Sequence, residues 1–96
     1  MPTPSLPVLD ATAAAIDVGS EQLHVSIAGG PPKIFGTTTG ELHALRDYFL
    51  AQGVRSVAME ATGIYWLCPY EVLEKAGLEV VVVNGKYVKN LPGRET

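Results

Sequence analysis

The chain has 96 residues, of which 47% are hydrophobic and 18% charged, so it can bury a core as one small domain and is not a disordered tail. Its net charge of −3, taken over the whole chain, argues against a surface that binds phosphate or nucleic acid. The single cysteine, Cys68, excludes a disulfide framework and a cysteine-based zinc site within the chain. No apolar run reaches the roughly 18 residues of a membrane span, and no secretory signal is present, so we expect a cytoplasmic protein.

The charge is distributed unevenly along the chain. Residues 1–83 carry four basic and nine acidic side chains, a sum of −5, whereas residues 84–96 carry three basic side chains and one acidic, a sum of +2. Residues 1–12 contain three prolines and are predicted to be a flexible leader. Residues 13–96 are then the folded part, an acidic body that ends in a short basic tail.

Three strands are predicted in the first part of the folded region. Residues 13–18 form a mostly apolar run that does not alternate, which favours a strand buried on both faces. Residues 23–27 alternate with a period of two and predict a half-exposed strand, and residues 33–38 can form a third. The connections are short and rich in glycine and proline, so we expect an antiparallel meander.

The pattern changes to that of a helix at Thr38. Thr38 and Glu41 have the spacing of a capping box, in which each side chain bonds a free amide at a helix start. An apolar stripe of Leu42, Leu45 and Phe49 follows at helical spacing. Gly53 stands where a left-handed C-terminal cap belongs.

Two strands and a second helix are predicted after Gly53. Residues 55–59 form a short apolar strand that ends at Glu60, and residues 79–83 contain four consecutive valines; both are expected to be buried. A helix over about residues 65–76 lies between them, with Pro69 tolerated near its start.

The order β-β-β-α-β-α-β predicts an α/β fold with a mixed sheet, flanked by helices, in which three antiparallel strands precede parallel ones. With no closing helix, we expect the chain to be truncated.

Two acidic residues are the leading candidates for chemistry. Asp17 interrupts an apolar strand, where a buried carboxylate needs hydrogen-bond partners or a cation, and Glu60 ends another strand. If the two strands are parallel neighbours, both carboxylates emerge at one edge of the sheet, where functional groups gather. Close carboxylates repel unless a cation lies between them, and Mg²⁺ prefers oxygen ligands. The alternative is that Asp17 merely bonds the amides of the turn after its strand.

Other residue types are less informative. His24 and His43 stand alone, without metal-ligand spacing, and are interpreted as ordinary surface or core residues. Tyr65, Trp66 and Tyr70 follow Glu60 and can either stack on nucleic-acid bases or pack in the core, and core packing is the commoner role.

Several segments together resemble the N-terminal domain of the DEDD transposases, the insertion-sequence enzymes related to the Piv-type DNA invertases. The resemblance runs from about residue 13 to the end of the chain. It rests on these segments, of which the second and the last are specific in combination: Ala15-Ile16-Asp17-Val18-Gly19, Met59-Glu60-Ala61-Thr62-Gly63, Leu73-Glu74-Lys75-Ala76-Gly77, Val82-Val83-Asn84 and Lys89-Asn90-Leu91-Pro92-Gly93-Arg94.

The resemblance implies an RNase H-like fold of the RuvC type, and an intact protein that cleaves and transfers DNA strands during transposition. It implies that Asp17 and Glu60 are catalytic metal ligands, the first two of four acids, for Mg²⁺ or Mn²⁺. The other two acids would lie beyond residue 96, so we expect this segment alone to be inactive. Some family members use a structured guide RNA, which makes one a candidate partner, and we expect a homo-oligomer. We also interpret Lys86, Lys89 and Arg94, in the basic tail, as phosphate contacts.

Two other classes of function remain open from the sequence. In an actin-like ATPase or sugar kinase, Asp17-Val18-Gly19 would belong to a phosphate loop, although Glu60 follows too soon for the large inserts of those enzymes. The chain can also be a non-catalytic module that only assembles with partners.

Overall fold

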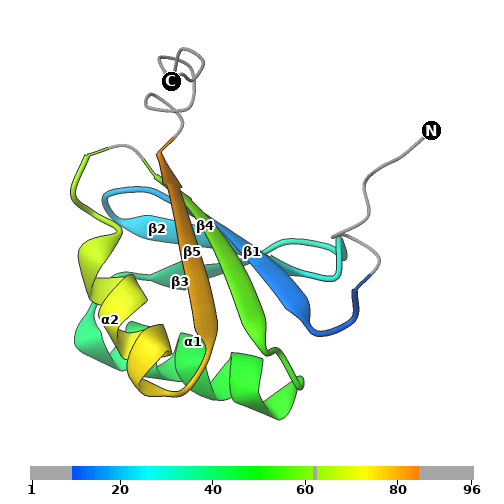
Figure 1. Cartoon of the computed structure of the whole chain (residues 1–96). Helices are drawn as coiled ribbons and strands as arrows, with labels where there is room; N and C mark the ends of the chain where they lie inside the picture. The colour runs from blue at the N-terminus through cyan, green and yellow to red at the C-terminus, as the bar shows by residue number, and fades with distance from the viewer. Residues whose placement is uncertain (1–9, 62, 85–96) are drawn as a thin grey trace.

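A computed structural model describes residues 10–61 and 63–84 of the chain. Five strands and two helices follow one another in the predicted order (Figure 1). Their bounds are β1 (Ala13–Val18), β2 (Gln22–Ile27), β3 (Lys33–Gly36), α1 (Thr39–Ala51), β4 (Ser56–Ala61), α2 (Leu67–Lys75) and β5 (Glu79–Asn84).

The strands form a single mixed sheet in the order β3-β2-β1-β4-β5. β1 pairs antiparallel with β2, and β2 pairs antiparallel with β3, as the short connections predicted. β4 runs parallel to β1, and β5 runs parallel to β4. The two parallel connections each contain a helix, since a parallel strand has to be reached by a crossover. The first strand therefore lies in the middle of the sheet, between the meander and the parallel half.

Both helices pack on the same face of the sheet (Figure 1). On α1 the buried residues are Leu42, Leu45 and Phe49, which are the predicted apolar stripe, and on α2 they are Pro69 and Leu73. They meet a sheet surface of alternate strand residues, namely Ala14, Ile16, Val18, Leu23, Val25, Val57, Met59 and Ala61. No helix within residues 10–61 and 63–84 covers the other face, which we call the open face.

The prediction that β1 is buried on both faces is wrong, and β4 and β5, which were predicted to be buried, are each exposed on one face. In β1 and β4, buried residues alternate with exposed ones, and on β5 the side chains of Val81 and Val83 are 57% and 37% exposed. The physical reason is that both crossover helices lie on one side of the sheet. The alternation is hidden in the sequence because alanine occupies both faces of β1 and valine both faces of β5.

The start of α1 differs in one detail from the predicted capping box. The backbone N–H of Glu41 donates to Oγ1 of Thr38 at 3.3 Å, so Thr38 is the N-cap as expected. The Glu41 carboxylate does not return the bond to Thr38; it accepts instead from the backbone N–H of Gly36 at 2.8 Å. Glu41 therefore joins the helix start to the end of β3. At the other end of the helix, Gly53 has the predicted left-handed conformation, with φ of 79°.

The second helix starts two residues later than the sequence predicted, at Leu67. Pro69 is its third residue, within the first turn, where the missing N–H costs no intrahelical bond. The helix ends before Gly77, whose φ of 93° reverses the chain into β5.

Candidate metal centre

Asp17 and Glu60 are register partners on the adjacent parallel strands β1 and β4. Neighbouring strands lie about 4.8 Å apart, and residues in register project on the same face of the sheet. Both side chains are exposed on the open face, near the carboxyl ends of their strands. The sequence-based expectation that these two acids share one edge of the sheet is therefore met by the strand pairing.

The expectation that Asp17 is buried is wrong, because only the opposite face of β1 is covered by helices. Burial thus does not compel Asp17 to find a partner. What would favour a cation here is instead the repulsion between two carboxylates on adjacent strands in register.

A third polar residue, His24, belongs to the same row of side chains. His24 on β2 is the register partner of Asp17 on its other side, so His24, Asp17 and Glu60 stand in line across three strands. His24 is also exposed. The sequence alone shows His24 as an isolated histidine without metal-ligand spacing. The tight turn between Gly19 and Gln22 fixes this register, because the N–H of Gly19 donates to the Gln22 carbonyl at 2.9 Å. The short spacing between the two strands was the feature of the sequence that could have placed His24 beside Asp17.

The basic side chains of the described segments lie away from this row. Lys33 projects on the helix-covered side, where its Nζ lies 4.6 Å from the centre of the Tyr48 ring. Arg46 and Lys75 are on the two helices, and Arg55 precedes β4 at the opposite end of that strand. Counting only residues 10–61 and 63–84, the open face around Asp17 and Glu60 is consequently acidic, which attracts a cation and repels an uncompensated phosphate.

The donor set fits a hard divalent cation in kind, because both acids offer carboxylate oxygens on an accessible surface. It does not make a complete site. Within residues 10–61 and 63–84, no group of three histidine, cysteine, aspartate or glutamate side chains is placed to hold a metal ion. A metal held by Asp17 and Glu60 would need further ligands, and water or phosphate oxygens are the usual additions for Mg²⁺.

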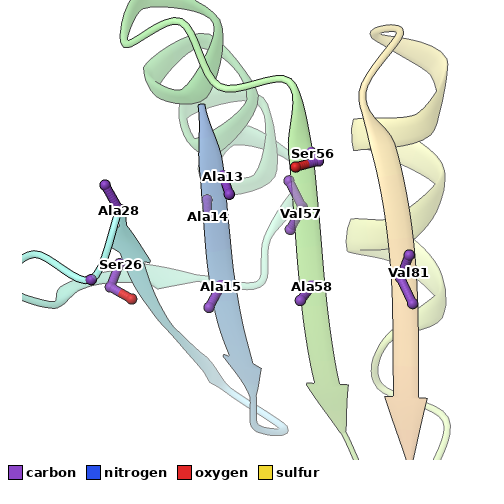
Figure 2. A pocket seen from close by; sticks show the side chains of 10 residues that line it. Ala13, Ala14, Ala15, Ser26, Ala28, Ser56, Val57, Ala58 and Val81 are labelled. Atoms are coloured by element: carbon purple, nitrogen blue, oxygen red, sulfur yellow. The ribbon is translucent and has the colours of Figure 1, made fainter. Parts of the chain in front are cut away.

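A shallow hollow lies on the open face toward the starts of β1 and β4, at the other end of these strands from Asp17 and Glu60 (Figure 2). It has a volume of about 230 Å³, and small side chains make up most of its lining. Ala15 and Ala58 stand two residues before Asp17 and Glu60 on their strands, and Figure 2 shows them side by side with Val81 of β5 beyond. Along β1 and β4 the open face before the acids is therefore lined by alanine, whereas Val83 on β5 stands beside Glu60 and Ile34 on β3 stands beside His24.

The three aromatic residues after Glu60 divide between the two roles that the sequence left open. Trp66 and Tyr70 pack against the core and against each other edge to face, with ring centres 5.7 Å apart. Tyr65 is 54% exposed and follows Ile64, which is 78% exposed. Core packing therefore holds for Trp66 and Tyr70, and Tyr65 is accessible.

The predicted phosphate contacts Lys86, Lys89 and Arg94 lie outside the residues that the structure describes, as does the leader up to residue 9. The leader's last residues form a turn, in which the backbone N–H of Thr12 donates to the Asp10 carboxylate at 2.8 Å. The bonds that Thr12 donates hold the pKa of Asp10 below its usual value.

Comparison with known families bears on the kinase alternative that the sequence left open. The family model of the IS110-type DEDD transposases, described as a transposase, matches residues 14–96. The chain belongs to this family. Membership in the DEDD transposases confirms the resemblance and sets aside the kinase alternative. Transposases act on DNA, which is the substrate class that membership indicates.

No curated protein matches the chain. No helix in the described ranges of this DEDD transposase domain is long and apolar enough to cross a membrane.

Proposed function

We propose that this domain supplies Asp17 and Glu60 as catalytic metal ligands to a transposase that cleaves and transfers DNA strands, on an RNase H-like fold of the RuvC type. The observation that carries the proposal is the in-register pairing of Asp17 with Glu60 on the open face. Two acids from segments more than forty residues apart in the chain meet at one point of an accessible surface, and in the part of the chain that the structure describes neither acid forms an ion pair.

The role of the two side chains follows from their charge and position. Held in register, the carboxylates of Asp17 and Glu60 offer oxygen ligands with little further ordering, because the strands on which they stand are already paired. Mg²⁺ or Mn²⁺, when bound, would stabilise the attacking and leaving oxygens of the phosphodiester. Binding of a cation would also remove the repulsion between the two acids and neutralise the negative charge that otherwise repels a DNA backbone.

The surroundings support access by DNA. Ala15 and Ala58 precede the two acids on the open face, so a sugar–phosphate backbone that approaches along β1 and β4 meets only small side chains before it reaches them. The exposed Tyr65 follows Glu60 along the chain and offers an aromatic face to a base.

We further propose that the basic tail contacts phosphate through Lys86, Lys89 and Arg94. Replacing all three with glutamine in the full-length protein should weaken DNA binding. It should also make the slope of log K against log salt shallower by about 2 to 3, because DNA binding releases about one counterion fewer for each phosphate contact that is lost. An unchanged salt slope would remove the tail from the DNA-binding surface.

The proposed metal site is tested by Asp17→Asn and Glu60→Gln in the full-length transposase. Each variant keeps the size of the side chain and removes one charge, so the circular dichroism spectrum should match that of the wild type. Cleavage of a DNA substrate in Mg²⁺ or Mn²⁺ should fall by about 100-fold or more, since a metal ligand contributes several kcal/mol to the transition state.

The matched control is Glu79→Gln. Glu79 is exposed on the same open face, but it pairs with Ser56 at the far end of the sheet. Its replacement should leave cleavage close to that of the wild type. Retained cleavage in Asp17→Asn would overturn the proposal.

A further inference from the structure

We propose that His24 is a further residue of this site and donates a hydrogen bond from its imidazole to a nonbridging oxygen of the DNA phosphate at Asp17 and Glu60. This inference rests on the proposed function, because it places the same phosphodiester at the same acids. It differs from that function in the residue, in the strand that supplies it and in the chemistry of the contact.

The backbone pairing places His24 beside Asp17. The N–H of Ala28 donates to the Ala13 carbonyl at 2.8 Å, and the N–H of Gly19 donates to the Gln22 carbonyl at 2.9 Å. Hydrogen-bonded pairs of an antiparallel ladder recur at every second residue, so Asp17 and His24 form such a pair, with Cα atoms about 5.5 Å apart. Their side chains project on the same face.

The row of three residues has a width that suits one phosphate group. Asp17 lies between His24 and Glu60, about 5.5 Å from the first and about 4.8 Å from the second at the level of the backbone. A phosphodiester placed over Asp17 is therefore within reach of side chains from both neighbouring strands. The strands hold this arrangement without a loop or a lid.

The His24 side chain is free to make the contact. It is exposed, and within residues 10–61 and 63–84 no side-chain hydrogen bond engages it. Imidazole carries an N–H donor whether it is neutral or protonated, so the proposed contact does not depend on the charge of His24.

The charges around the site give His24 a role that no other basic side chain of the described segments can fill there. The lysines and arginines of those segments lie on the helices, on the helix-covered side or at the opposite end of β4. A phosphate that meets Asp17 and Glu60 on this face thus has the imidazole of His24 beside it as a nitrogen donor. A donor aimed at a phosphate oxygen stabilises the charge that develops during strand cleavage.

The test uses the full-length transposase with His24→Ala and His24→Asn, and His43→Ala as the matched control. His43 is exposed on α1, which covers the opposite face of the sheet. Three quantities are measured for each variant: the cleavage rate at saturating DNA, the dissociation constant for DNA, and Mn²⁺ binding from water-proton relaxation.

We expect His24→Ala to lower the cleavage rate at saturating DNA by about 100-fold, the usual effect of removing one preorganised donor. Mn²⁺ binding should remain at the wild-type level, because His24 is not a metal ligand in this proposal. His24→Asn retains an N–H donor, so its cleavage rate should be at least about a tenth of the wild-type rate. His43→Ala should behave as the wild type.

Four results would overturn the inference: full cleavage by His24→Ala, an equal loss in His43→Ala, a His24→Asn variant as inactive as His24→Ala, or loss of Mn²⁺ binding with the imidazole. If His24→Ala fails to fold, His24→Val replaces it, because valine suits a strand position and carries no hydrogen-bond donor. Asp17→Asn and Glu60→Gln are assayed in parallel. Full cleavage in those two would defeat the proposed function, whereas their loss together with full cleavage by His24→Ala would defeat the role of His24 alone.

Discussion

Asp17 on β1 and Glu60 on β4 are register partners on the open face of the sheet, so two like charges lie on adjacent strands about 4.8 Å apart. Like charges directly opposite one another destabilise a sheet, by roughly 0.2–1 kcal/mol for a cross-strand pair. The pairing therefore lowers the stability slightly when no cation is bound, and the two negative charges together attract a cation.

This cost can be measured without any DNA. In metal-free buffer at low salt, we expect Asp17→Asn to raise the free energy of unfolding by up to about 1 kcal/mol, because it removes the repulsion with Glu60. Addition of Mg²⁺ or Mn²⁺ should raise the melting temperature of the wild type and not that of the variant, since a ligand that binds the folded state stabilises it. Thermal unfolding followed by circular dichroism measures both effects.

Glu79→Gln is the control for this prediction as well. Glu79 is exposed on the same face, but its register partner on β4 is the uncharged Ser56. Its removal should change the stability little and leave the effect of the metal in place. An equal metal response in Asp17→Asn and the wild type would contradict the assignment of Asp17 as a ligand.

The core between α1 and the sheet depends on Leu45. This side chain is fully buried, whereas Leu50 in the same helix is 47% exposed. We expect Leu45→Ala to lower the free energy of unfolding by about 2–5 kcal/mol, because it loses buried surface and leaves a cavity. Leu50→Ala should cost less than about 1 kcal/mol, and urea denaturation compares the two. Similar costs at both positions would mean that α1 packs through a different face.

The N-cap of α1 is a separate contribution to stability. The hydroxyl of Thr38 accepts the bond from the Glu41 N–H at the start of the helix. Thr38→Ala should therefore destabilise the protein by about 1 kcal/mol. Thr39 is exposed and is the first residue of the helix, so Thr39→Ala should change the melting temperature little. A Thr38→Ala variant as stable as Thr39→Ala would show that the cap carries no net energy.

Two glycines at the ends of α1 should respond in opposite directions to the same substitution. A Cβ atom meets nothing within 4 Å at either Gly53 or Gly40, so only the backbone decides. Gly53 has a φ of 79°, and Gly53→Ala should cost about 1 kcal/mol. Gly40 is helical, and Gly40→Ala should add about 0.5 kcal/mol. Differential scanning calorimetry of the two variants checks the sign, and a shift in the same direction would contradict it.

Local sequence was sufficient for the elements that depend on neighbours in the chain. The capping threonine Thr38, the apolar stripe of α1 and the left-handed glycine at 53 were predicted and appear as expected, because caps, periodicity and left-handed turns are decided within a few residues. The start of the second helix was two residues out. The second half of the capping box was wrong because Gly36, from a neighbouring strand, competes for the Glu41 carboxylate.

Burial was less accessible to the sequence. Runs of alanine and valine look alike whether one face or both are covered, so the exposure of Asp17, Val81 and Val83 could not be read from composition. It depends on which side of the sheet receives each crossover helix. Both helices lie on the same side, and the face that carries the acids stays open (Figure 1).

The sequence by itself determined the order of the elements, the identity of the two acids and, through its segment motifs, the transposase family. These are properties of local patterns. Only the tertiary structure decided that Asp17 is exposed, that Glu60 is its neighbour in register and that His24 stands on its other side. The physical reason is that strand register and the placement of helices are set by contacts between segments far apart in the chain, and those contacts decide which side chains can meet a substrate together.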